Sequence, residues 1–128
     1  MMEITAGVNW LAVVVGAVAA FLLGSLWFSP MLFGKKWAAG VGVELGSAAS
    51  MPVAAMVTQA IGLFLVAWVV GVTATQNALL TLILITLAFT VMAMSNGMFV
   101  KKSGYAVTVE AGYSIAVVAV MFVAQAIL

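Results

Sequence analysis

Four residue types are missing from this chain: cysteine, histidine, aspartate and arginine do not occur. Without cysteine the chain can form no disulfide, and without cysteine or histidine it lacks the usual ligands of zinc and other soft metals. Charge of either sign is scarce, since four lysines and three glutamates make up 5% of the residues and leave a net charge of +1. This balance predicts no nucleic-acid partner, and nothing in the composition indicates a cofactor.

Apolar residues take the place of the charged ones. They account for 67% of the 128 residues, whereas a soluble globular domain carries about 25% charged residues. A soluble domain of this size could not bury so much apolar surface, because small domains keep a large fraction of their surface in water. The composition therefore predicts one all-α integral membrane domain over the whole chain, 1–128.

Four apolar stretches are long enough to cross a bilayer, which takes about 20 helical residues. They cover 8–28, 52–72, 78–100 and 104–128. Ser29-Pro30 ends the first, because proline restrains the residue before it and donates no backbone hydrogen bond. Ser50 and Pro52 form a typical helix start for the second. Between these two helices, 31–50 is predicted to be a connector at the membrane interface.

An internal repeat divides the chain into two halves. The stretch 29–46, SPMLFGKKWAAGVGVELG, agrees at eight positions with 95–112, SNGMFVKKSGYAVTVEAG. Unrelated stretches of this composition would agree at roughly one or two positions, so duplication explains the match better. Six of the seven charged residues belong to the repeat, and Glu3 alone lies outside it. Because each half crosses the membrane twice, the halves are predicted to be parallel hairpins related by a pseudo-twofold axis along the membrane normal.

Both lysine pairs follow an odd-numbered helix, so both are predicted at the same face of the membrane. Lysine accumulates in short cytoplasmic loops, which places Lys35, Lys36, Lys101 and Lys102 in the cytoplasm and both termini outside. We expect these four lysines to contact anionic lipid headgroups, at about 1 kcal/mol each.

Small residues recur every four positions on two of the predicted helices. They are Ala12, Gly16, Ala20 and Gly24 on the first helix, and Gly104, Thr108, Gly112 and Ala116 on the fourth. Such stripes allow the backbones of two helices to approach closely in lipid. Because the two stripes can pair only partly within one subunit, we expect a homo-oligomer or docking to a larger membrane complex.

A motif at the end of the first helix resembles that of a known family. The stretch WFSPMLFGKKW at 27–37, preceded by Asn9-Trp10, is similar to the pattern Trp-Tyr-Ser-Pro-x-Leu-Phe-Gly-Lys-x-Trp of small bacterial inner-membrane proteins called domain of unknown function 1761. Phe28 replaces the tyrosine, and Glu110-Ala111-Gly112-Tyr113 stands where the family has Asn-Ala-Gly-Tyr. The resemblance spans nearly the whole chain. It implies four transmembrane helices in a bacterial inner membrane and no assigned activity, and an acid at position 110 departs from the family pattern.

Glu110 is the main candidate site residue, because it lies eight positions beyond Lys102, about 12 Å along a helix. If the last helix begins just after the lysines, this carboxylate lies more than one turn inside the membrane, where ionisable groups are costly and usually functional. Tyr113 and Ser114, three and four residues on, could hydrogen-bond it. Its role would then be a protonatable site in a transport path. The alternative is an interfacial acid answered by the neighbouring lysine pair or by the positive helix N-terminus.

The remaining polar residues also have two interpretations. Gln59, Asn96 and the threonines of the third helix could line a path or serve as hydrogen-bonding contacts between helices. Glu44, the repeat mate of Glu110, precedes the second helix and is expected at the surface. A serine and a lysine could formally form a dyad, but no further acid–base group accompanies them, so the chain is not expected to be an enzyme.

Two functional classes stay open. The first is a non-catalytic scaffold or accessory subunit that acts through helix packing and lipid contact. The second is a small oligomeric transporter or channel that uses Glu110 and the polar faces of the second and third helices. The small multidrug transporters share the size and helix number, but their essential acid lies in the first helix, which has none here.

Overall fold

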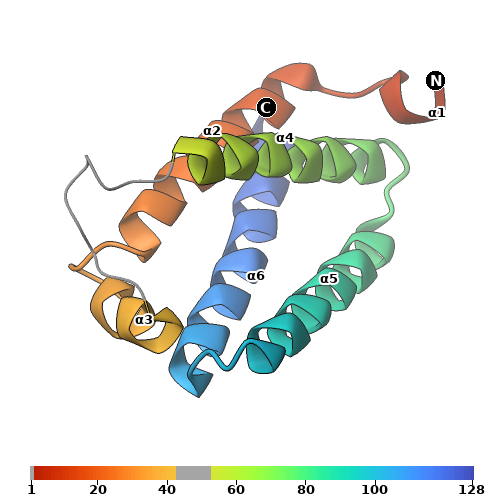
Figure 1. The fold of residues 1–128 in the computed structure, drawn as a ribbon. Coiled ribbons are helices and arrows are strands. Elements are labelled where there is room, and N and C mark those ends of the chain that lie inside the picture. The colour runs from red at the N-terminus through yellow and green to blue at the C-terminus, as the bar shows by residue number, and fades with distance from the viewer. Residues whose placement is uncertain (1, 43–52) are drawn as a thin grey trace.

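Helices make up most of the chain that the computed structural model describes, residues 2–42 and 53–128 (Figure 1). They are α1, Met2–Thr5; α2, Trp10–Trp27; α3, Gly34–Val41; α4, Val53–Thr75; α5, Leu79–Phe99; and α6, Gly104–Ile127. The described residues contain no strand. Because α2, α4, α5 and α6 are long and apolar enough to cross a bilayer, they confirm the predicted all-α fold with four transmembrane helices.

α2 and α6 begin where the sequence supplies a capping side chain. Asn9 Oδ1 accepts the backbone hydrogen of Ala12 at 3.1 Å, and Ser103 Oγ accepts that of Ala106 at 3.0 Å. These oxygens satisfy backbone donors that have no partner inside the helix. α2 begins at Trp10, two residues later than the predicted range 8–28, and α6 begins at Gly104, as predicted. The predicted cap at Ser50 and Pro52 lies outside the described residues.

The connector predicted over 31–50 contains a helix, α3, that was not predicted from the sequence. A tight corner leads into it, in which Gly34 N–H donates to Ser29 O at 2.9 Å. A side chain at Gly34 would collide with the carbonyl oxygen of Phe28, so the corner requires glycine. An eight-residue helix is marginal on its own, and α3 is stabilised by its contact with α6. Residues 43–50 of the connector lie outside the described residues.

α6 is the central helix. It contacts α2, α3, α4 and α5, and Figure 1 shows it (blue) between α2 and α5. The close packing of α2 on α6 depends on two glycines of the small-residue stripe. A Cβ atom on Gly16 would lie 3.3 Å from Met121 Cγ, and one on Gly24 would lie 2.6 Å from the Tyr113 hydroxyl oxygen. The α2 stripe therefore packs against α6 of the same chain.

The predicted stripe of α6 is used only in part. The ring of Trp27 packs over Gly112, where a Cβ atom would lie 3.2 Å from Cζ2 of the indole. A Cβ atom on Gly104 would meet no atom of residues 2–42 and 53–128 within 4 Å, and Thr108 is exposed. Intramolecular pairing thus accounts for the α2 stripe and for the middle of the α6 stripe, which weakens the stripes as a reason to expect oligomers.

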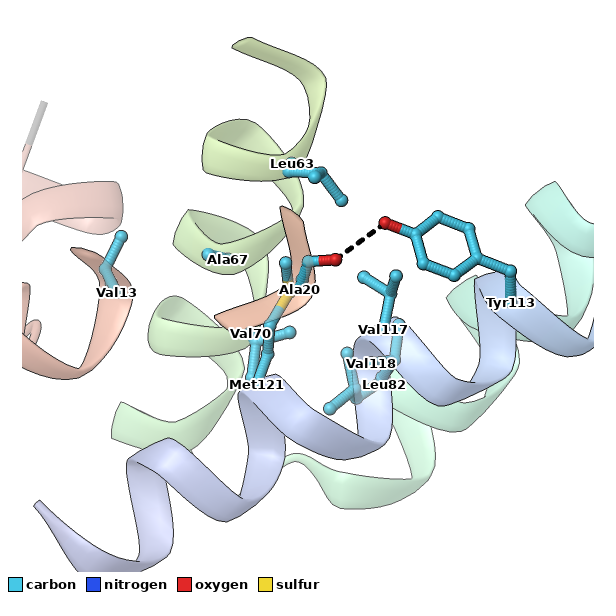
Figure 2. Packing of buried hydrophobic residues seen from close by; sticks show 10 residues of the cluster. All are labelled: Val13, Ala20, Leu63, Ala67, Val70, Leu82, Tyr113, Val117, Val118 and Met121. Atoms are coloured by element: carbon cyan, nitrogen blue, oxygen red, sulfur yellow. Dashed lines mark hydrogen bonds between the residues drawn. The ribbon is translucent and has the colours of Figure 1, made fainter. Parts of the chain in front are cut away.

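Side chains from α2, α4, α5 and α6 meet in one buried cluster (Figure 2). Its members are Val13, Ala20, Leu63, Ala67, Val70, Leu82, Tyr113, Val117, Val118 and Met121. Outside this cluster, long apolar side chains such as Leu80 and Val91 are exposed. An apolar outer surface of this kind suits helices whose surroundings are hydrocarbon rather than water.

Both lysine pairs lie at the same end of the helices. Ser103 N–H donates to the carbonyl oxygen of Gly40 at 2.9 Å, which joins α3 to the turn between α5 and α6. The Lys36 ammonium lies 5.0 Å from the centre of the Tyr105 ring, at the start of α6. A side chain on Gly40 would overlap Ser103, so this contact also depends on glycine. Figure 1 shows α1 and the end of α6 at the opposite end.

The two halves of the chain are not packed equivalently. α2 contacts α6 extensively, whereas α4 and α5, the corresponding pair under the predicted pseudo-twofold, make a much smaller contact. In Figure 1, α4 and α5 diverge from the turn that joins them. The pseudo-twofold axis therefore stays a prediction.

Candidate functional site

The carboxylate of Glu110 connects α6 to two other elements at the lysine end. Lys102 Nζ, from the α5–α6 turn, lies 2.9 Å from Oε1 and 3.1 Å from Oε2 of Glu110. The Nε1–H group of Trp37, from α3, donates to Oε2 at 2.8 Å. Side-chain exposures of 30% for Lys102 and 28% for Glu110 show that the pair is neither fully solvated nor fully enclosed. Glu110 is thus a partly buried acid with two strong donors.

A cap at the end of α5 brings Lys102 to this position. Lys101 adopts a left-handed conformation with φ of 62°, and Lys102 N–H donates to Gly97 O at 3.0 Å. This is the usual way to satisfy the last carbonyl groups of a helix and reverse the chain. Lys102 can therefore reach back to the second turn of α6, whereas Lys101 is exposed. Of the two interpretations of Glu110, this geometry agrees with an interfacial acid that forms an ion pair with a neighbouring lysine.

Tyr113 and Ser114 do not bind the Glu110 carboxylate. The Tyr113 hydroxyl donates to the carbonyl oxygen of Ala20 on α2 at 2.8 Å (Figure 2), and the Gln59 side chain of α4 lies close enough to interact with it. The Ser114 hydroxyl donates to the backbone oxygen of Glu110 at 3.2 Å, as serine often does within a helix. The expected hydrogen bonds to the carboxylate were wrong for two reasons. The long Tyr113 side chain reaches α2, and the short Ser114 side chain bonds to the backbone of its own helix.

The polar residues of α5 lie apart from Glu110. Asn96 is exposed and lines a shallow hollow of about 520 Å³ along α5. Thr86 and Thr90 are buried, and the Thr86 hydroxyl donates to Leu82 O at 2.8 Å. Thr90 Oγ1 has no hydrogen-bond partner within the described part of the chain. The predicted site residues therefore occupy several separate places instead of one polar cavity.

Two tryptophans, Trp27 at the end of α2 and Trp37 in α3, contact α6 directly. Besides the bond from Trp37, the Nε1–H group of Trp27 donates to Val109 O at 3.0 Å. Phe28 packs between Trp37 and Tyr113, with its ring centre 4.8 Å from that of Trp37 and 5.3 Å from that of Tyr113. Indole N–H groups that are partly buried need an acceptor, but the sequence does not reveal which one, because the acceptors lie more than 70 residues away.

Three ammonium groups remain at the lysine end. Lys35, Lys36 and Lys101 are exposed, and none of them forms an ion pair with an acid of the described ranges. The repeat mate Glu44 lies outside those ranges. Residues 2–42 and 53–128 contain no cluster of three metal-ligating side chains. The chemistry available at this end is thus the binding of anions by lysine, because the indole N–H groups of Trp27 and Trp37 already donate to Val109 and Glu110.

Comparison with curated proteins and with solved structures gives no match to the chain. A protein family described as "Protein of unknown function (DUF1761)" matches residues 11–125, which is nearly the whole chain. The match covers the corner motif after α2 and the start of α6, and it confirms the resemblance seen in the sequence. The chain therefore belongs to the DUF1761 family of proteins of unknown function.

Proposed function

We propose that this protein is a non-catalytic membrane scaffold or accessory subunit that acts through helix packing and lipid contact. The observation that carries the proposal is the state of Glu110, whose carboxylate is already bound by Lys102 and Trp37. A proton-coupled carrier needs an acid that faces a wet cavity and can exchange partners. The two hollows described for this chain are lined by other residues. A structural role for Glu110, holding α3 on α6, fits these contacts better.

Lipid contact is supported by the groups found at the two ends of the helices. Lys35, Lys36 and Lys101 are exposed at one end, and anionic headgroups attract such lysines by about 1 kcal/mol each. Tryptophan rings occur at both ends, with Trp10 and Trp68 in contact at 5.2 Å far from the lysines. We place the lysine end in the cytoplasm of a bacterial inner membrane, with both termini outside, following the usual distribution of lysine.

A second candidate is a small oligomeric transporter or channel. One observation favours it: the Thr90 hydroxyl is buried and lacks a partner among residues 2–42 and 53–128. A buried polar group without a partner often binds water or a ligand. With the exposed Gln59 and Asn96 it would mark polar faces on α4 and α5. In this case Glu110 would have to release Lys102 during transport.

Proton flux through liposomes distinguishes the two candidates. Purified protein is reconstituted into liposomes that contain a pH-sensitive dye, and the decay of an imposed pH gradient is followed. A scaffold predicts the decay rate of protein-free liposomes, both for the native chain and for Glu110→Gln. Faster decay that Glu110→Gln abolishes would refute the scaffold proposal. Glu3→Gln, which changes an acid outside the four spanning helices, is the matched control.

A further inference from the structure

A hollow of about 300 Å³ lies where three spanning helices end or begin. Its walls come from the end of α4 and the turn after it, from the start of α5 and from the last turns of α6. The hollow along α5 described above has a wall from one helix only, whereas this one is formed by the packing of three. It lies at the end of the helices opposite to the lysine pairs. We call it the three-helix hollow.

The cap at the end of α4 forms one wall of the three-helix hollow. Asn77 adopts a left-handed conformation with φ of 52°, its N–H group donates to Ala74 O at 3.3 Å, and Ala78 N–H donates to Thr73 O at 2.9 Å. This pair of bonds ends α4 and turns the chain into α5. The left-handed conformation is a sufficient reason for an asparagine at 77. Its side-chain amide borders the hollow and forms no hydrogen bond within the described ranges.

Gln125 has no comparable backbone reason to be polar. It lies in the last turn of α6, and its Nε2 atom is 3.2 Å from the place that a Cβ atom on Gly71 would take, so its side chain lies against α4. The residue is half-buried, lines the hollow and forms no hydrogen bond with residues 2–42 or 53–128. Polar groups in such surroundings usually have a partner. The Gln125 amide is therefore available to a molecule in the hollow.

The rest of the lining is mainly apolar and uncharged. Val70 and Leu82 belong to the buried cluster and close the hollow on its inner side, and Phe122 forms part of the α6 wall. None of the described residues that line the hollow is a lysine or a glutamate. A charged group placed there would lose water without gaining an ion pair, which is costly. The lining thus favours a neutral molecule with an apolar part and a hydrogen-bonding part.

We propose that the three-helix hollow binds a neutral membrane amphiphile, whose carbonyl oxygen accepts a hydrogen bond from Gln125 and whose apolar part packs on Val70 and Leu82. The ends of spanning helices lie where hydrocarbon gives way to headgroups, and two kinds of membrane molecule place a neutral carbonyl group there. Diacyl lipids do so through their glycerol esters, and isoprenoid quinones do so through their ring. The volume is at the lower limit of small-molecule sites, so the hollow holds the carbonyl end and the adjoining part of such a molecule. The site is independent of the scaffold role and of the lipid contacts of the lysines.

Stabilisation of the purified protein by added ligand tests the site. Dioctanoylglycerol and a benzoquinone with a decyl chain are added separately to the protein in detergent micelles, and the midpoint of thermal unfolding is followed by circular dichroism. A ligand that binds only the folded chain raises this midpoint as its concentration rises. At least one of the two probes should raise the midpoint by several degrees. Its analogue without carbonyl oxygens, the dioctyl glycerol ether or decylbenzene, should raise it much less.

Two variants with matched controls assign the effect to the hollow. Gln125→Leu removes the amide at a similar side-chain size and should weaken the apparent affinity about tenfold. Gln76→Leu removes an exposed amide outside the lining and should respond as the native chain does. Ala126→Phe places a ring in the hollow and should abolish the shift. Val123→Phe adds the same ring at a position that is 52% exposed and outside the lining, and should preserve it.

The outcomes separate the proposal from its alternatives. A midpoint that neither probe moves would overturn it, because water alone would then fill the hollow. Equal shifts for the native chain and Gln125→Leu, or for a probe and its carbonyl-free analogue, would also overturn it, because the probes would then act through the micelle. If Ala126→Phe does not fold, the comparison of Gln125→Leu with Gln76→Leu decides. A response to the diacylglycerol alone identifies a lipid ester as the natural source of the carbonyl, and a response to the benzoquinone alone identifies a quinone. A response to both, lost in the variants, shows a site that selects the carbonyl group alone.

Discussion

The contact between Gly24 and Tyr113 predicts that substitutions at these two positions are energetically coupled. A Cβ atom on Gly24 would lie 2.6 Å from the Tyr113 hydroxyl oxygen and 3.0 Å from the ring carbon Cζ. Both distances are shorter than an ordinary van der Waals contact of about 3.5–4.0 Å. The same hydroxyl donates to Ala20 O at 2.8 Å. Gly24→Ala should therefore push α6 away from α2 and weaken this hydrogen bond.

The magnitude follows from three opposing effects. Overpacking by one carbon typically costs about 1–3 kcal/mol, and the better helix propensity of alanine offsets about 1 kcal/mol of that. Tyr113→Phe removes a hydrogen bond between spanning helices, which contributes about 0.6 kcal/mol on average, and keeps the ring against Phe28. In the double variant the added methyl group no longer meets an oxygen. The double variant should thus be less destabilised than the sum of the single variants, by about 1 kcal/mol.

Equilibrium unfolding in mixed micelles, followed by circular dichroism as the fraction of denaturing detergent rises, measures all members of this cycle. Gly104→Ala combined with Tyr113→Phe is the control, because a Cβ atom on Gly104 meets nothing within 4 Å in the part of the chain that the structure describes. The control pair should be additive within about 0.5 kcal/mol. Additivity of the Gly24 and Tyr113 variants to the same precision would refute the packing of α2 on α6 described above.

Three further substitutions test other contacts. Trp37→Phe removes the hydrogen bond donated to Glu110. Hydrogen exchange measured by mass spectrometry should then be faster for the amides of α3 but not for those of α6. Unchanged exchange in α3 would show that the bond does not hold this helix. Gly34→Ala should lower the yield of folded protein, since its side chain would collide with the backbone of the corner before α3, whereas Gly104→Ala should express normally; equal yields would contradict the corner geometry. Thr90→Val should leave the midpoint of unfolding unchanged or raise stability by about 1 kcal/mol, because it removes a buried hydroxyl that has no partner among the described residues. A clear loss of stability would mean that the hydroxyl is bonded.

The four spanning helices could be predicted because their length is set by the bilayer and their ends by local chemistry. Asn9, Ser103 and the Ser29-Pro30 corner act within a few residues of where they stand in the chain. α3 was not predicted, although Trp37, Ala38 and Val41 recur at helical spacing, because a helix of eight residues is marginal on its own and is stabilised by docking on α6 through Gly40. Local signals therefore located the helices that lipid stabilises, and missed the one that tertiary contact stabilises.

The candidate site was predictable only as far as neighbours in sequence determine it. The ion pair of Glu110 with Lys102 joins residues eight apart, and a lysine partner was among the expected alternatives. The second donor, Trp37, is 73 residues away, and no pattern in the sequence indicates that contact. Tyr113 shares a helix face with Glu110 but bonds to α2, since the direction of a long side chain depends on the neighbouring helix. Helical spacing shows which residues share a face, and packing then decides their partners.

Both lysine pairs must lie at the same face of the membrane if α3 docks on α6 through Gly40 and Ser103. The most direct measurement uses single Lys35→Cys and Lys101→Cys variants in intact cells, treated with a maleimide that cannot cross the membrane. We expect both cysteines to be protected until the cells are permeabilised, and then to react together. Labelling of one from outside while the other reacts only after permeabilisation would contradict the arrangement of α3, α5 and α6.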